Sequence, residues 1–121
     1  MTRIGWALIL LLAASGAAFG AGEDEGIAAR CENEWPQDYA MQEYCAGRQQ
    51  DGLTALHDFM ARYGITPEND RSRYDSGDPP ARILHDCASE WHDRFGTDWN
   101  MTAYCVRRQE EAAKRLGKLH E

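Results

Sequence analysis

Four cysteines are the residues of this 121-residue chain whose type and spacing suggest a definite chemistry. They stand at positions 31, 45, 87 and 105, and cysteine side chains bind zinc, exchange disulfides or form structural bridges. No two of them form a C-x-x-C pair, which argues against a redox enzyme and against c-type haem attachment. No histidine stands beside them at ligand spacing, which argues against zinc. We therefore predict two structural disulfides and no metal site.

The cysteines lie in a stretch that occurs twice. Residues 31–49 read CENEWPQDYAMQEYCAGRQ, and residues 87–109 read CASEWHDRFGTDWNMTAYCVRRQ. Both copies contain C-x-x-E-W and then D-(Tyr/Trp)-x-M-x-x-Y-C-x-x-R-Q, and the second copy has four more residues between these two blocks. Agreement at so many positions indicates a tandem duplication, so we expect both copies to share one local fold.

The first copy has the apolar pattern of a helical hairpin. Four-residue steps between Ile27, Cys31 and Trp35 predict a short helix. Asp38 is then placed to cap a long amphipathic helix that runs back in the opposite direction. Gly52 interrupts this long helix, at a modest expected cost to its stability.

The second copy repeats this pattern, with Thr97 or Asp98 as the cap of its long helix. We therefore predict an all-α fold of two tandem, disulfide-pinned, antiparallel helical hairpins. The expected organisation is, in chain order, a signal peptide (1–20), the first hairpin (21–64), a linker (65–78) and the second hairpin (79–121).

The spacing of the cysteines predicts how they pair. In an antiparallel hairpin, residues at equal distances from the turn face each other. Cys31 precedes Asp38 by seven residues and Cys45 follows it by seven, so these two cysteines lie level. In the second copy, the longer connection absorbs the difference in spacing. We predict Cys31–Cys45 and Cys87–Cys105, because pairing between the copies would not explain why each carries its own two cysteines.

Residues 1–20 have the composition of a removable export signal. Arg3 is followed by an apolar run over residues 4–14 and a small-x-small cleavage site at residues 18–20. The run is shorter than the roughly 20 apolar residues of a membrane span. We expect cleavage after Gly20 and a secreted or periplasmic protein without membrane attachment; an uncleaved N-terminal anchor is the alternative.

The chain beyond residue 20 is strongly acidic. It holds all 20 acidic residues and 12 of the 13 basic ones, which argues against a nucleic-acid partner. It also contains few Leu, Ile, Val and Phe residues, so we expect its core to depend on aromatic side chains and on the disulfides.

Aromatic residues are repeated near each disulfide. Trp35 corresponds to Trp91, and Tyr44 corresponds to Tyr104. These side chains suit either the wall of a binding groove or the protein core. Helical spacing beside a disulfide favours the core.

A repeated Arg-Gln pair is the strongest candidate for an interaction site. It consists of Arg48, Gln49, Arg108 and Gln109. Core packing does not require arginine, so the pair either joins the hairpins through salt bridges or presents a shared polar surface. Salt bridging is the favoured interpretation, with Glu34 and Glu90 as the nearest carboxylates by repeat position.

The signature C-x-x-E-W-P-x-D-Y-x-M-x-x-Y-C-x-x-R-Q of the first copy resembles a short motif in small exported bacterial proteins of uncharacterised function. This resemblance implies no activity, catalytic residue or ligand. No nucleophile–base pair or phosphate-binding loop is visible, so we expect a non-enzyme without a cofactor. The favoured function is an interaction or structural module of the cell envelope, with a protein partner of unknown identity. The alternative is a small-ligand or metal-binding periplasmic protein that uses the cleft between the hairpins.

Overall fold

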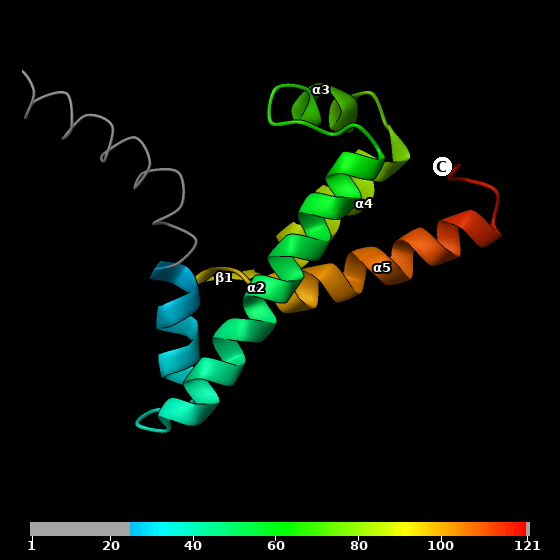
Figure 1. The fold of residues 1–121 in the computed structure, drawn as a ribbon. Coiled ribbons are helices and arrows are strands. Elements are labelled where there is room, and N and C mark those ends of the chain that lie inside the picture. The colour runs from blue at the N-terminus through cyan, green and yellow to red at the C-terminus, as the bar shows by residue number, and fades with distance from the viewer. Residues whose placement is uncertain (1–24, 121) are drawn as a thin grey trace, which may run out of the picture.

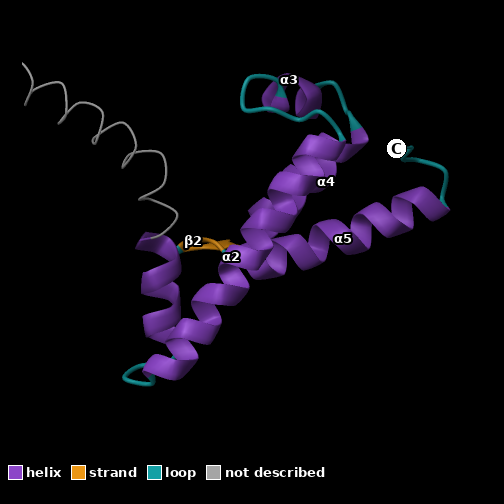
Figure 2. Ribbon diagram, viewed as in Figure 1, coloured by secondary structure: helices purple, strands orange, loops and turns teal. Residues whose placement is uncertain are grey.

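Helices make up most of the computed structural model, which describes residues 25–120 (Figure 2). They comprise residues 25–34, α2 (Tyr39–Arg62), α3 (Asp70–Asp75), α4 (Pro79–Glu90) and α5 (Trp99–Arg115). A short antiparallel hairpin of β1 (His92–Asp93) and β2 (Gly96–Thr97) connects the last two helices. The predicted all-α fold is confirmed, and the predicted signal peptide lies outside the described residues.

The first hairpin pairs the helix of residues 25–34 with the beginning of α2, and the two helices run in opposite directions (Figure 1). The Cys31–Cys45 disulfide joins them, with Cα atoms 5.6 Å apart. Asp38 Oδ1 accepts a hydrogen bond from the backbone N–H of Met41 at 3.1 Å, which satisfies one of the free donors at the start of α2. Both the predicted bridge and the predicted cap are confirmed.

The second hairpin consists of α4 and α5, joined by the Cys87–Cys105 disulfide with Cα atoms 5.7 Å apart. This pairing also agrees with the prediction. The four additional residues of the second copy allow the connection to form the β1–β2 hairpin, in which His92 pairs with Thr97. Of the two candidate caps, Asp98 is the one used, because its Oδ1 accepts the N–H of Met101 at 3.2 Å.

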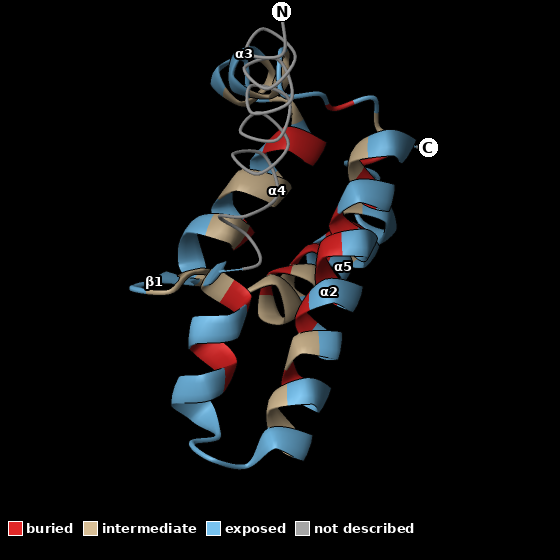
Figure 3. Ribbon diagram, turned by 60° about the vertical axis from the view of Figure 1, so that its left-hand side comes forward, coloured by how far each residue is buried: buried red, intermediate tan, exposed pale blue. Residues whose placement is uncertain are grey.

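The two hairpins share one hydrophobic core, since α2 packs along α5. Its buried members come from both hairpins and are Leu56, Phe59, Ile65, Cys87 and Val106. A smaller cluster under the first disulfide contains Ile27, Cys31 and Cys45, and Trp99 packs against both clusters. Figure 3 shows buried residues on the sides of the helices that face one another, with exposed residues outside. The two hairpins therefore bury each other's apolar faces.

The two hairpins approach each other closely at Gly52 of α2. A Cβ atom at this position would lie 2.4 Å from the carbonyl oxygen of Trp99 and 2.8 Å from the backbone nitrogen of Asn100. These are backbone atoms and cannot turn aside as a flexible side chain would. The modest cost that we predicted for Gly52 in its own helix is therefore secondary, because glycine is required for α2 to meet the start of α5.

The segment of residues 65–78, which we predicted to be a linker, has defined structure. Ile65 is buried, and α3 forms within the segment. Arg73 donates a hydrogen bond to the carbonyl oxygen of Tyr63 at 2.6 Å and pairs with Asp78 at 2.7 Å. These contacts connect the end of α2 to the start of α4.

Candidate functional site

The repeated arginines lie over tyrosines of their own helices. The Arg48 guanidinium is 6.0 Å from the ring centroid of Tyr44, and that of Arg108 is 5.7 Å from the ring centroid of Tyr104. Each pair is four residues apart, which places both side chains on one helix face. Within residues 25–120 neither arginine forms an ion pair, so the salt bridges that we predicted to Glu34 and Glu90 are not formed.

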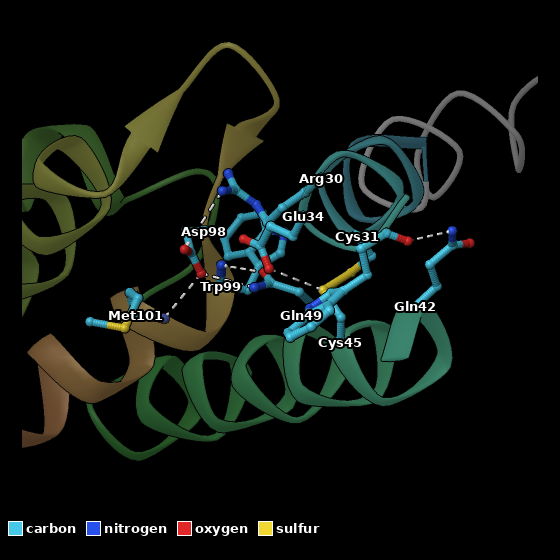
Figure 4. The surroundings of a disulfide bond; sticks show 10 residues. Arg30, Cys31, Glu34, Gln42, Cys45, Gln49, Asp98, Trp99 and Met101 are labelled. Carbon is cyan, nitrogen blue, oxygen red and sulfur yellow. Dashed lines mark hydrogen bonds and ion pairs between the residues drawn. A yellow bond between two sulfur atoms is a disulfide. The ribbon is translucent and has the colours of Figure 1, made fainter. Parts of the chain in front are cut away.

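The two repeated glutamines have different environments. Gln49 is buried, its Nε2 donates to Asp98 Oδ1 at 2.9 Å, and its Oε1 accepts the backbone N–H of Trp99 at 2.8 Å (Figure 4). Gln49 therefore ties the first hairpin to the start of α5. Gln109 is exposed. The difference arises because Gln49 lies where α2 passes the beginning of α5, whereas Gln109 lies on an exposed side of α5.

Arg30 connects the first hairpin to the second, and its role was not predicted from the sequence. Its side chain is 6% exposed and donates to both carboxylate oxygens of Asp93, at 2.9 and 2.8 Å. It also donates to the carbonyl oxygen of Gly96 at 3.2 Å and lies 3.6 Å from the carboxylate of Asp98. The hydrogen bonds from Arg30 are the main reason why the pKa of Asp93 lies below its ordinary value.

A weak signal for this contact exists in the sequence. Arg30 directly precedes the first cysteine of copy one, whereas the equivalent residue in copy two is Asp86. Asp93 lies in the longer connection of copy two, for which copy one has no counterpart. Two unmatched residues of opposite charge in otherwise matching repeats are thus candidates for a contact between the copies.

A second buried ionic cluster lies where the end of α2 meets α5. Glu110 accepts hydrogen bonds from Arg62 at 2.9 Å and from the Tyr63 hydroxyl at 2.5 Å, and Lys114 lies 3.7 Å away. Burial of the Glu110 carboxyl acts to raise its pKa, but these hydrogen bonds and the two positive charges lower the pKa below its ordinary value. The cluster holds Glu110 in its charged form.

The lowered pKa values of Glu110 and Asp93 predict a loss of stability in acid. A carboxyl whose pKa is lower in the folded state stabilises the fold above its unfolded pKa of roughly 4, and this contribution disappears as the pH falls through the folded value. We expect the melting temperature to fall progressively below about pH 4. Glu110→Gln should lower the melting temperature at neutral pH and make its acid dependence shallower.

The matched control for this experiment is Glu111→Gln, which changes the exposed neighbouring carboxylate on the same helix. Its melting curve should follow the wild-type protein at every pH. Equal acid dependence in the Glu110→Gln variant and the wild-type protein would show that the Glu110 cluster does not contribute to the pH response.

Each disulfide has a glutamate beside one of its sulfur atoms. Glu34 Oε2 lies 3.7 Å from Cys45 Sγ, and Glu90 Oε2 lies 3.9 Å from Cys105 Sγ. The two glutamates are the repeated residues of C-x-x-E, one helical turn after the first cysteine. Their placement puts a carboxylate within 4 Å of each bridge, where it repels an incoming anionic thiolate.

We therefore predict that Glu34→Gln and Glu90→Gln accelerate reduction of the adjacent bridge by an anionic thiol. The expected increase in rate is several-fold, because Coulomb repulsion of the attacking thiolate is removed. Reduction by a cationic thiol such as cysteamine should not accelerate. Equal acceleration with both reagents would instead indicate that the substitutions loosen the hairpin. Trapping of free thiols over time, followed by mass spectrometry, measures both rates.

The repeated aromatic side chains are more exposed than predicted. Trp35 is 39% exposed, Tyr44 is 59% exposed and Tyr104 is 46% exposed, whereas Trp91 is half-buried. The expectation that they form the core is wrong for the three exposed residues. Trp35 follows the end of its helix and lies in the turn before α2, so it does not share the buried side of Ile27.

Of these exposed side chains, Tyr104 lines a groove between α2 and α5, which we call the α2–α5 groove. It has a volume of about 850 Å³, and Leu56, Phe59 and Val106 are the buried apolar residues in its lining. A smaller hollow of about 350 Å³, lined by Trp35 and Tyr44 among others, adjoins it. The two share the lining residues Arg48, Asn100 and Met101. Tyr104 thus borders the groove, Tyr44 borders the adjoining hollow, and Arg48 lines both, whereas Arg108 lines neither.

No protein-family model, curated protein or solved structure matches this chain, so its function is argued from the geometry. Two intrachain disulfides are typical of an oxidising, extracytoplasmic compartment. Within residues 25–120, no helix has the length and apolar character that a membrane span needs. The same residues contain no group of three or more His, Cys, Asp or Glu side chains placed to hold a metal ion.

Proposed function

We propose that the protein is a non-enzymatic interaction module of the bacterial cell envelope, secreted or periplasmic, which binds a protein partner at the α2–α5 groove and the smaller hollow that adjoins it. The observation that carries this proposal is the exposure of the same Tyr-Arg pair in both copies. Tyr44 with Arg48 and Tyr104 with Arg108 contribute little to the core, and neither arginine has a carboxylate partner in the described part of the chain.

Tyrosine and arginine are suited to this role. Both are enriched at the centres of protein interfaces, because they combine a large contact area with polar groups that can be satisfied by a partner. An arginine that rests on a tyrosine ring is held in a limited range of positions, so less side-chain entropy is lost when a partner binds. The acidic character of the chain supports a protein partner over a nucleic acid.

Capture of a partner from the envelope tests this proposal. We expect the exported wild-type protein to recover one protein in stoichiometric amount, and a Tyr44→Ala/Tyr104→Ala variant to lose it. The matched control is Tyr39→Ala, which removes a tyrosine that is 76% exposed on the same α2 helix but does not line the groove. All three proteins should melt within about 2 °C of one another, since surface substitutions change stability little.

Two results would contradict the proposal. Equal recovery of the partner by the double variant and the control would show that the repeated tyrosines are not needed for binding. A large drop in melting temperature in the double variant, with binding retained, would assign Tyr44 and Tyr104 to stability instead.

The smaller hollow supports a second candidate function, the binding of a small ligand. Trp35, Met41 and Tyr44 give it apolar walls, and Arg48 and Asp98 supply polar groups, which is a common arrangement in ligand sites. A thermal-shift screen over metals and small ligands distinguishes the two functions. A shift that Trp35→Ala abolishes would favour the ligand, whereas no shift with intact partner capture would favour the interaction module.

A further inference from the structure

We propose that the partner inserts an amphipathic helix into the α2–α5 groove, and that the helix side facing α2 reads acidic, basic, apolar, basic, acidic. This inference rests on the proposed function and names the chemistry of the partner. It follows from the spacing of the groove walls, their lack of free backbone groups and the order of their charges.

The α2 wall of the groove is a single stripe of side chains. Its members follow one another at steps of three and four residues and are Arg48, Asp51, Ala55, Asp58 and Arg62. This spacing places all five on one face of α2. At 1.5 Å per residue the stripe is about 21 Å long, which corresponds to four turns of a docked helix.

The α5 wall has the same spacing. Tyr104, Arg107, Glu111 and Lys114 follow one another at steps of three and four residues and line the same groove. The two helices run in the same direction, because Gly52 lies against Trp99 and, ten residues later, Arg62 reaches Glu110. Two side-chain ridges of helical spacing on either side of an apolar floor form a groove into which the ridge of a third helix fits.

A helix fits this groove better than an extended peptide. Both walls are α-helices whose backbone hydrogen bonds are made internally, so they offer no donors or acceptors to an added strand. An extended peptide would leave its own backbone groups without partners at the buried floor. A helix satisfies its backbone internally and presents only side chains.

The charges of the α2 wall determine the complementary pattern. In order they are positive, negative, neutral, negative and positive, from Arg48 to Arg62. Arg48, Asp51 and Asp58 form no ion pair within residues 25–120, so these charges are available to a partner. Arg62 and Lys114 both pair with the single carboxylate of Glu110, so the Arg62 end of the groove keeps a net positive charge. The order reads the same in both directions, and the complement is therefore the same for a parallel and an antiparallel partner helix. A second copy of this chain that used its own α2 stripe would bring like charges together.

Two synthetic helical peptides of identical composition test the inference. Each has about 20 residues on an alanine-rich background. The matched peptide carries Glu, Lys, Leu, Lys and Glu at successive three- and four-residue steps, and the inverted peptide carries Lys, Glu, Leu, Glu and Lys. By isothermal titration calorimetry, we expect the wild-type protein to bind the matched peptide about ten-fold more tightly than the inverted peptide. The reason is that the four charged contacts with the α2 wall are attractive in the first complex and repulsive in the second.

A charge-reversal variant locates this preference on the protein. Asp51→Lys/Asp58→Lys should reduce the ratio of the two affinities to about one, since the two central contacts reverse. The control is Glu32→Lys/Glu43→Lys, which changes net charge equally at two exposed positions outside the groove and should keep the ten-fold ratio. Circular dichroism verifies that both variants remain folded.

The result that overturns the inference is equal affinity of the wild-type protein for the two peptides, or no binding of either. Retention of the ten-fold ratio by Asp51→Lys/Asp58→Lys would also overturn it, because the preference would then arise elsewhere. These outcomes leave partner capture through Tyr44 and Tyr104 as a separate test of the proposed function.

Discussion

Replacing Gly52 with alanine is expected to lower the stability of the protein by about 2 kcal/mol or more. The new Cβ would lie 2.4 Å from the carbonyl oxygen of Trp99, so α2 and α5 would have to separate. Separation would also stretch the hydrogen bond that Gln49 donates to Asp98 and the one that it accepts from the backbone N–H of Trp99. The gain of about 1 kcal/mol in helix propensity only partly offsets this loss. Thermal unfolding should show a melting temperature lower by about 10 °C.

Gly47→Ala is the matched control for this substitution. Gly47 lies in the same helix, but a Cβ atom there has no other heavy atom within 4 Å apart from its own helix neighbours. Alanine at position 47 should therefore raise stability by about 0.5 to 1 kcal/mol. A Gly52→Ala variant that melts as high as the Gly47→Ala variant would show that the hairpins do not meet at this point.

Replacing Arg30 with methionine is the second change with a large expected effect, a loss of about 2 to 3 kcal/mol. Methionine fills a similar volume but removes the buried charge that holds Asp93 and Asp98. Asp93 is half-exposed and regains water, which keeps the loss below the upper end of the range for buried pairs. Arg30→Lys should be intermediate, because lysine keeps the charge but not the two-pronged geometry.

Arg94→Met supplies the control for Arg30. Arg94 is exposed, donates a single hydrogen bond to Asn33 at 3.2 Å and lies over the ring of Phe95, which Arg30 also contacts. Its replacement should cost about 0.5 kcal/mol or less. Denaturant unfolding with both disulfides intact measures all three variants. Similar losses for Arg30→Met and Arg94→Met would show that the buried ion pair does not hold the hairpins together.

Several parts of the fold were predictable because they depend on residues close together in the chain. The hairpins follow from helical spacing and from the caps Asp38 and Asp98, whose carboxylates bond backbone groups three residues ahead. The Cys31–Cys45 bridge follows from its symmetry about the turn. Within one copy, steric and hydrogen-bonding constraints act over a few residues, and the same residue pattern occurs in both copies.

The candidate site was only partly predictable. The repeat identified Arg48 and Arg108, but Gln49 and Gln109 occupy equivalent positions in the two copies and differ in burial. Repeated residues keep equivalent positions within their own hairpin, whereas the second hairpin packs against only part of the first. Sequence identity between the copies therefore does not imply equal burial.

The sequence by itself determined the hairpins, their disulfides and the residues that recur on their long helices. Only the tertiary structure decided that Gly52 is a contact point and that Arg30 pairs with Asp93. It also decided that Tyr104 borders the α2–α5 groove and that Tyr44 borders the hollow beside it. The physical reason is the range of the interactions. Capping and helical periodicity act within a few residues, but the docking of two hairpins depends on how whole side-chain surfaces fit, and residues about 50 apart in the chain supply each side of that fit.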